Sequence, residues 1–187
     1  GSDAAIGQMM EGVELPEFQE AFDIDTYDWT LKGCKGDDLH KTIQNVFYTD
    51  FDYPKTLRAR YAMIEEKEQR WESYQTEDAQ IILVAYGCSS RICKEAVEMG
   101  RAEGLKLGLI RPITLWPFPV KAFENLKNVK GFISVEINIL GQMVDDVKLA
   151  TGCRYPVGFV GSFFDVPEPD DILVEARRIL MEGQEGK

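Results

Sequence analysis

The chain has 187 residues, of which 44% are hydrophobic and 28% charged, and its formal net charge at pH 7 is −11. This length suffices for one domain with a sizeable core, or for one domain and part of another. The acidic balance argues against nucleic acid or an anionic membrane as a partner, because phosphate binding depends on clustered Lys and Arg side chains. The apolar runs are strand-sized and the first residues lack the pattern of a secretory signal, so we expect neither a membrane span nor a signal peptide.

The cysteines and the histidine give no metal-binding pattern. Cys34, Cys88, Cys93 and Cys153 form no C-x-x-C pair, and His40 is the only histidine. A zinc or iron–sulfur site needs several thiolates or imidazoles at close spacing, so we expect no metal site in this chain. We expect His40 to be a solvated loop residue, the thiols to be reduced and the protein to be cytoplasmic.

The first part of the chain is irregular. Residues 1–53 show no sustained hydrophobic period, so they do not resemble a domain of their own. Residues 54–74 predict one long helix with a proline in its first turn and a single apolar stripe, formed by Leu57, Tyr61, Ile64 and Trp71. Such a helix usually bridges two bodies, so we interpret residues 54–76 as a connecting helix.

From residue 77 onward, apolar strands alternate with amphipathic helices. The predicted strands are 81–87, 105–110, 131–138 and 156–160. Between them we expect a helix that Ser89 or Ser90 caps and Gly104 ends, a short helix over 120–126, and a helix over 140–152. The apolar face of this last helix is expected to comprise Leu140, Met143, Val144 and Val147.

A final helix is expected to start at Pro169. Near-continuous apolar strands that alternate with helices predict an α/β fold, an open, mostly parallel sheet with helices on both faces and right-handed crossovers.

Ligands of such sheets bind at the carboxyl ends of the strands, which places the candidate positions at 87–90, 111–118, 136–138 and 161–164. No phosphate loop of the form G-x-G-x-x-G or G-x-x-x-x-G-K-[ST] occurs there. The sheet alone therefore does not imply a nucleotide ligand.

Three side chains at these positions have both a functional and a structural interpretation. Cys88, at the start of a helix, is either a nucleophile with a lowered pKa or a residue of the turn, and this half of the chain has no histidine to serve as its base. Glu136 is either an acid or base, or more commonly an acceptor of hydrogen bonds at the sheet rim. Arg111, held extended before Pro112, either pairs with a carboxylate across an interface or reaches solvent.

The connection LIRPITLWPFP, residues 109–119, is stiff and apolar. Its three prolines reduce the entropy that is lost when the loop becomes ordered. Trp116 and Phe118 either bury their rings against a neighbouring domain or subunit, or close the core of their own domain, and we favour the first. We expect no catalytic residue in the chain, and the interface candidates are Arg111, Trp116, Phe118 and Glu136.

Two long strings carry a resemblance to a known family. VAYGCSSRICKEAVEMGRAEGLKLGLIRPITLWPFP and SVEINILGQMVDDVKLATG resemble domain II of the alpha subunit of 2-oxoacid:ferredoxin oxidoreductases, thiamine-diphosphate enzymes that convert 2-oxo acids to acyl-CoA. The strings YDWTLKGCKG and EKEQRWESYQTEDAQ are similar to the linker of the branched-chain type, which acts on 3-methyl-2-oxobutanoate. The resemblance covers nearly the whole chain.

The resemblance implies that residues 77–187 are similar to the C-terminal domain of transketolases and that residues 1–53 are the tail of the preceding pyrimidine-binding domain. In the family, thiamine diphosphate and magnesium are held by that preceding domain and the beta subunit, and iron–sulfur clusters lie in other polypeptides or domains. The implied partners are the beta and gamma subunits and, through the complex, ferredoxin, with CoA and a 2-oxo acid as substrates. The chain alone is then expected to bind none of these cofactors and to be catalytically incomplete.

The sequence departs from the family pattern at two places. Glu168 stands where a hydroxyl cap commonly precedes the last helix, and Cys88 and Cys93 stand where small residues are commoner. An alternative to the enzyme subunit is a free-standing α/β module that binds a small anionic ligand or nucleotide. The irregular first third of the chain favours the subunit, because a self-sufficient module would not need it.

Overall fold

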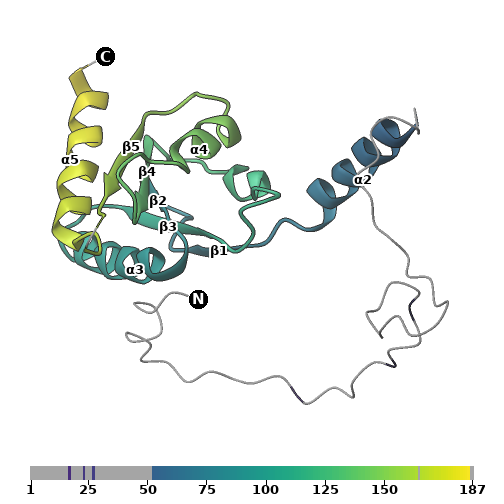
Figure 1. Ribbon diagram of the computed structural model, residues 1–187. Coiled ribbons are helices and arrows are strands. Elements are labelled where there is room, and N and C mark those ends of the chain that lie inside the picture. Colours follow the sequence, from purple (N-terminus) through teal and green to yellow (C-terminus); the bar gives the residue numbers. More distant parts are fainter. Residues whose placement is uncertain (1–16, 18–22, 24–26, 28–51, 164, 186–187) are drawn as a thin grey trace.

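The computed structural model describes residues 17, 23, 27, 52–163 and 165–185. The expectations for the tail 1–53, for His40 and for Cys34 therefore concern residues outside this part, apart from those few positions. In the described part an α/β body carries a single helix, α2 (Tyr53–Lys67), that projects from it (Figure 1). Among the described residues, no helix has the length and apolar character that crossing a membrane requires.

The body is built on one five-stranded sheet with the strand order β1-β3-β2-β4-β5. The strands β3, β2, β4 and β5 are parallel, and β1 pairs with β3 in the antiparallel direction. The predicted open, mostly parallel sheet is confirmed. The strands are β1 (Trp71–Tyr74), β2 (Ile81–Val84), β3 (Leu107–Pro112), β4 (Gly131–Glu136) and β5 (Val157–Gly161).

Helices cover both faces of the sheet because alternate strand residues point to opposite sides. Ile81 and Leu83 of β2 belong to the core cluster beneath α3 (Gly87–Ala102) and α5 (Pro169–Glu185). Ile82 and Val84 belong to the opposite cluster, beneath α4 (Val144–Ala150) and the short 3-10 helix Val120–Phe123. Figure 1 shows α3 and α5 together on one side of the sheet and α4 on the other.

The connecting helix is shorter than its sequence pattern predicts. It ends at Lys67, and residues 71–74 form the edge strand β1, so the prediction of a helix over 54–74 is wrong in its last turns. Pairing with β3 satisfies the backbone groups of this segment, and Trp71 packs against the core cluster beneath α4. Here tertiary pairing overrides a helical pattern of charges.

Helix boundaries show two further differences. α3 begins at Gly87 without a side-chain cap, and Ser90, one of the two predicted caps, donates its hydroxyl hydrogen bond to the carbonyl oxygen of Gly87 (2.7 Å). α4 begins only at Val144, which leaves Leu140 in the preceding loop with 80% of its surface exposed, so its predicted place on a buried helix face is wrong. The predicted end at Gly104 is confirmed by its φ of +87° directly after the C-cap.

Helix α2 and the residues just after it contact Lys121 and the ring of Trp116 in the body. The Lys121 ammonium lies 2.8 Å from a carboxylate oxygen of Glu66, and the Lys121 backbone N–H donates to the side-chain oxygen of Gln69 (3.0 Å). The rings of Tyr61 and Trp116 meet edge to face with centroids 5.3 Å apart. No residue of α2 is buried in this chain, so polar contacts and one ring contact, rather than a shared core, hold the helix against the body.

The ion pair makes the docking of α2 dependent on pH. The hydrogen bond from Lys121 and its charge hold the pKa of Glu66 below its usual value of 4.5. Because this pKa is lowered in the folded state, the pair contributes to docking above pH 4.5 and is lost as the pH falls through the lowered value. Between about pH 5 and pH 3 we expect the NMR signals of the Lys121 amide and the Trp116 indole N–H to approach those of a Glu66→Gln chain. A Trp116 shift of equal size in Glu66→Gln itself would contradict this explanation.

Candidate functional site

The carboxyl ends of the four parallel strands lead into segments without any charged residue. We call residues 85–88, 113–119, 137–143 and 161–163 the carboxyl edge. None of them is Asp, Glu, Lys or Arg, although 28% of the whole chain is charged. Because parallel strands end at one side of a sheet, these segments share a single face of the body.

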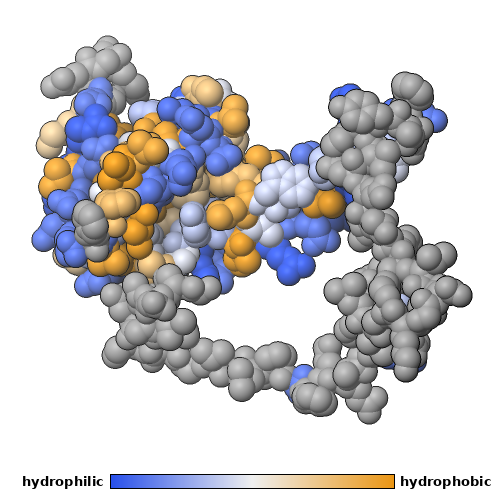
Figure 2. Space-filling view, in the orientation of Figure 1, coloured by the Kyte–Doolittle hydropathy of each residue, from blue (hydrophilic) through white to orange (hydrophobic). Residues whose placement is uncertain are grey.

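The carboxyl edge exposes large apolar side chains. Ile139 and Leu140 have 66% and 80% of their surface exposed, and Trp116 has 56%. Figure 2 shows hydrophobic residues gathered on the visible face of the body beside the start of α5. An exposed apolar patch of this kind is typical of a protein–protein contact. The exposed members are Tyr86, Ile113, Leu115, Trp116, Ile137, Ile139, Leu140 and Phe163.

Glu136 lies buried at the base of this edge, with only 4% of its surface exposed. Its carboxylate accepts hydrogen bonds from the Ser134 hydroxyl (2.7 Å), the Asn138 amide nitrogen (2.8 Å) and the backbone N–H of Met143 (3.1 Å). These three donors come from the strand, from the loop and from the start of the next helix segment. Glu136 thus accepts hydrogen bonds at the sheet rim, which is the structural interpretation given above, and it holds the loop after β4 in place.

Asn138 lies within the candidate positions 136–138, but the sequence pattern places it in the strand 131–138, and the strand ends at Glu136. The side-chain oxygen of Asn138 accepts the backbone N–H groups of Leu140 (3.0 Å) and Gly141 (2.7 Å). An asparagine shortly after a strand, with a glycine three residues later, is typical of such a turn. The positive φ of Gly141, +70°, completes the turn.

Acidic side chains flank the carboxyl edge without belonging to it. Asp145 and Asp146 stand in the first turn of α4, and Asp165 follows β5, all with exposed side chains. Partial burial, together with the charges of Asp145 and Glu136, raises the pKa of Asp146. The edge is therefore an uncharged surface with acidic side chains beside its segments 137–143 and 161–163, whereas Arg91, Arg111 and Lys121 adjoin its other two segments.

The other interface candidates have partners within the chain. Arg111 donates to both carboxylate oxygens of Glu72 (3.0 Å each), its neighbour across the β1–β3 pair. Phe118 stacks on Phe123 with ring centroids 5.7 Å apart, so its ring belongs to the core of this domain, which was the alternative for the two aromatic residues. Trp116 remains more than half exposed beside Tyr61.

The cysteines of the described part have different environments. Cys88 is half-buried at the start of α3, Cys153 is exposed, and Cys93 is buried in the core beneath α3, where desolvation raises the pKa of its thiol. All three are free thiols. Within the described residues, no three His, Cys, Asp or Glu side chains converge as they would to hold a metal ion.

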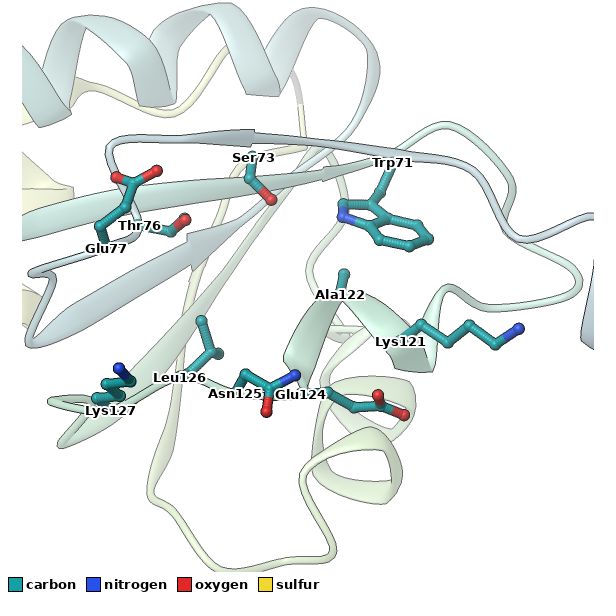
Figure 3. A pocket seen from close by; sticks show the side chains of 10 residues that line it. All are labelled: Trp71, Ser73, Thr76, Glu77, Lys121, Ala122, Glu124, Asn125, Leu126 and Lys127. Atoms are coloured by element: carbon teal, nitrogen blue, oxygen red, sulfur yellow. The ribbon is translucent and has the colours of Figure 1, made fainter.

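A groove of about 400 Å³ runs beside β1, between that strand and residues 121–127. In Figure 3 the side chains of Trp71 and Ser73 point from β1 toward Ala122, with Leu126 below them. The charges lining the groove balance, two lysines against two glutamates, and Lys121 is already bound to Glu66. The groove therefore offers no excess positive charge for the anionic ligand of the alternative hypothesis.

Comparisons with known proteins agree with the fold. The family description "Pyruvate:ferredoxin oxidoreductase core domain II" matches residues 79–164. The ketoisovalerate oxidoreductase subunit VorB of Methanothermobacter marburgensis is 44% identical over 158 residues, which are 82% of this chain and 44% of that protein. The 2-oxoglutarate synthase subunit KorA of Archaeoglobus fulgidus is 28% identical over 93% of this chain and 51% of that protein. The chain thus spans about half the length of these curated relatives.

Solved structures show the same fold. A 2-oxoglutarate:ferredoxin oxidoreductase from Magnetococcus marinus, with 2-oxoglutarate, coenzyme A and succinyl-CoA bound, superposes with a TM-score of 0.59 at 21% identity, over 71% of this chain and 24% of that one. A split-gene transketolase, in an inactive beta4 tetramer, superposes with a TM-score of 0.51 at 21% identity, over 60% of this chain and 41% of that one. The predicted likeness to a transketolase domain is confirmed. Residues 79–164, which contain the four parallel strands with α3 and α4, are therefore a core domain II of the pyruvate:ferredoxin oxidoreductase type.

Proposed function

We propose that the chain is part of the alpha subunit of a thiamine-diphosphate-dependent 2-oxoacid:ferredoxin oxidoreductase. The enzyme would convert 3-methyl-2-oxobutanoate (ketoisovalerate) and CoA to acyl-CoA, CO2 and reduced ferredoxin. The substrate rests on the 44% identity to VorB, whose name specifies ketoisovalerate. In this proposal the cytoplasmic complex also contains beta and gamma subunits, which meet ferredoxin.

We assign the described part an assembly role rather than a chemical one. The observation that carries this role is the carboxyl edge, which presents exposed apolar side chains and no charge at the place where α/β sheets usually hold ligands. The carboxylate at its base, Glu136 of β4, is buried and already accepts three donors. Thiamine diphosphate, magnesium and the iron–sulfur clusters would be held by other domains and subunits, and no step of the reaction is assigned to residues of this chain.

The proposal also covers the domain organisation. Residues 1–53 would be the tail of the pyrimidine-binding domain, residues 54–76 the connection and residues 77–187 domain II. Within the connection, α2 would set the distance between the two domains, and β1 attaches the connection to the sheet of domain II.

Trp116→Ala in the full-length alpha chain tests the assembly role. We expect the affinity for the other subunits to fall about 10-fold or more, because an exposed tryptophan at an interface is a typical hot spot. The melting temperature of the alpha chain should change by only a few degrees, since the indole is 56% exposed. Binding is measured by titration of purified subunits, and turnover by reduction of ferredoxin with 3-methyl-2-oxobutanoate and CoA.

Tyr61→Ala is the matched control, because it removes the ring contact of Trp116 within the chain and leaves the indole available to a partner. A melting temperature that falls steeply in Trp116→Ala while assembly stays intact would exclude the assembly role of this residue. Reduction of ferredoxin with pyruvate or 2-oxoglutarate, and not with the branched substrate, would exclude the proposed substrate.

A further inference from the structure

The loop between β4 and α4 has an unusual tip. Ile139 and Leu140 are adjacent aliphatic residues with 66% and 80% of their surface exposed. Both side chains stand in water in the described part of the chain, although burying one such side chain is worth about 1.5–3 kcal/mol. Leu149 of α4 is similarly exposed, at 74%, but it lies outside the carboxyl edge and next to charged neighbours.

The same loop is held in one conformation from several sides. Asn138 binds the N–H groups of Leu140 and Gly141, and Glu136 binds the N–H of Met143. The backbone N–H of Val144 donates to the carbonyl oxygen of Gly141 (3.3 Å). An ordered loop loses little conformational entropy on binding, so its apolar tip is already prepared for contact.

We propose that Ile139 and Leu140 form an anchor that inserts into an apolar pocket on a different subunit of the enzyme, and that Asn138 is a positioning residue for this anchor. The proposal rests on the assembly role argued above and adds its central contact. Trp116 and Tyr86 then belong to the same uncharged carboxyl edge as the anchor and are also exposed.

The charge around the anchor determines what kind of surface can cover it. Asp145, Asp146 and Asp165 stand beside the segments 137–143 and 161–163 of the uncharged edge, next to the anchor, on a chain of net charge −11. A second copy of the chain would bring the same aspartates and the same net negative charge to the contact, and an anionic membrane would bring phosphates, so both are repelled. The matching surface is an apolar pocket bordered by Lys or Arg side chains on a protein other than this one.

Photo-cross-linking in the assembled enzyme identifies the occupant. The full-length alpha chain, carrying p-benzoylphenylalanine in place of Leu140, is co-expressed with the other subunits, irradiated and analysed by mass spectrometry. We expect a cross-link to another subunit, at a pocket of apolar residues. A cross-link to a second alpha chain, to another part of the same chain or to lipid would overturn the proposal, as would the absence of any cross-link in an intact complex.

A variant series measures the strength of the anchor. Ile139→Ser combined with Leu140→Ser should weaken binding of the alpha chain to its partner subunit about 100-fold, whereas Leu149→Ser should change it by less than about 2-fold. All three positions are exposed, so the melting temperature of the alpha chain should stay within a few degrees of that of the unchanged chain. Equal effects of the double variant and the control would contradict the anchor.

Asn138→Ala separates positioning from a purely structural role. If Asn138 acts through the anchor, it weakens binding on its own and adds no further loss in the chain that already carries Ile139→Ser and Leu140→Ser. Additive losses would show that Asn138 does not act through the anchor. None of these measurements uses a substrate, so they can succeed where the proposed substrate fails, and the reverse is equally possible.

Discussion

Glu136→Ala is expected to lower the free energy of unfolding by about 3–5 kcal/mol, because two buried donors and one part-buried donor lose their acceptor at once. The donors are the Ser134 hydroxyl, the Asn138 amide and the Met143 backbone N–H. Each unsatisfied buried donor costs about 1–3 kcal/mol, and water that enters the space recovers part of the sum. Urea unfolding of the purified chain measures the loss.

Two further variants interpret this result. Glu136→Gln keeps one acceptor oxygen but turns an NH2 group toward a donor, so it should cost about half as much. Glu124→Ala, at an exposed position, should change the free energy of unfolding by less than about 0.5 kcal/mol. Unchanged stability of Glu136→Ala, together with a loss of turnover in the full complex, would return Glu136 to the acid or base interpretation.

Ile133→Ala is expected to lower the free energy of unfolding by about 3–4 kcal/mol, because it leaves a cavity in the core beneath α3 and α5. Ile133 is fully buried, and in the sheet it stands between Leu83 of β2 and Gly158 of β5. Gly158 has no side chain that could move into the space. The cavity therefore cannot be closed by its neighbour in β5, which places the cost in the upper part of the usual range.

Ile133→Val, which removes one methylene group, should cost about 1 kcal/mol. Ile113→Ala, at an exposed position of the carboxyl edge, should cost less than about 0.5 kcal/mol in the isolated chain. Thermal and urea unfolding measure all three variants under the same conditions. Equal losses for Ile133→Ala and Ile113→Ala would mean that the core beneath α3 and α5 is not packed as described.

The parallel part of the sheet could be predicted because its strands are apolar on both sides. Residues 81–84 and 131–136 are buried at every position, and such runs occur where helices cover both faces of a sheet. The buried face of α5 follows the helical spacing of its apolar residues, and Ile172, Leu173, Ala176 and Ile179 are buried. The local sequence pattern was enough to predict these strands and helices, because each is apolar wherever it packs on the sheet or on a covering helix.

The edge strand β1 could not be predicted in this way. Residues 68–74 continue the alternation of charges seen in α2, and only the free edge of β3, far away in the sequence, makes residues 71–74 a strand. Leu140 was placed on a helix face for the same reason, since its helical spacing is correct and only the turn built by Asn138 removes it from the helix. Of the candidate site, the strand ends and Glu136 were found from the sequence, and the turn that Asn138 forms was not.

The uneven distribution of charge also affects the solubility of the chain before it binds other subunits. Eight large apolar side chains are exposed on the carboxyl edge. On a protein without net charge, such a surface would promote aggregation at high concentration. The charge of −11 is carried by the rest of the chain, so free copies repel one another at long range and stay dispersed. High salt screens this repulsion, and the unassembled chain should then precipitate at concentrations at which the assembled enzyme remains clear.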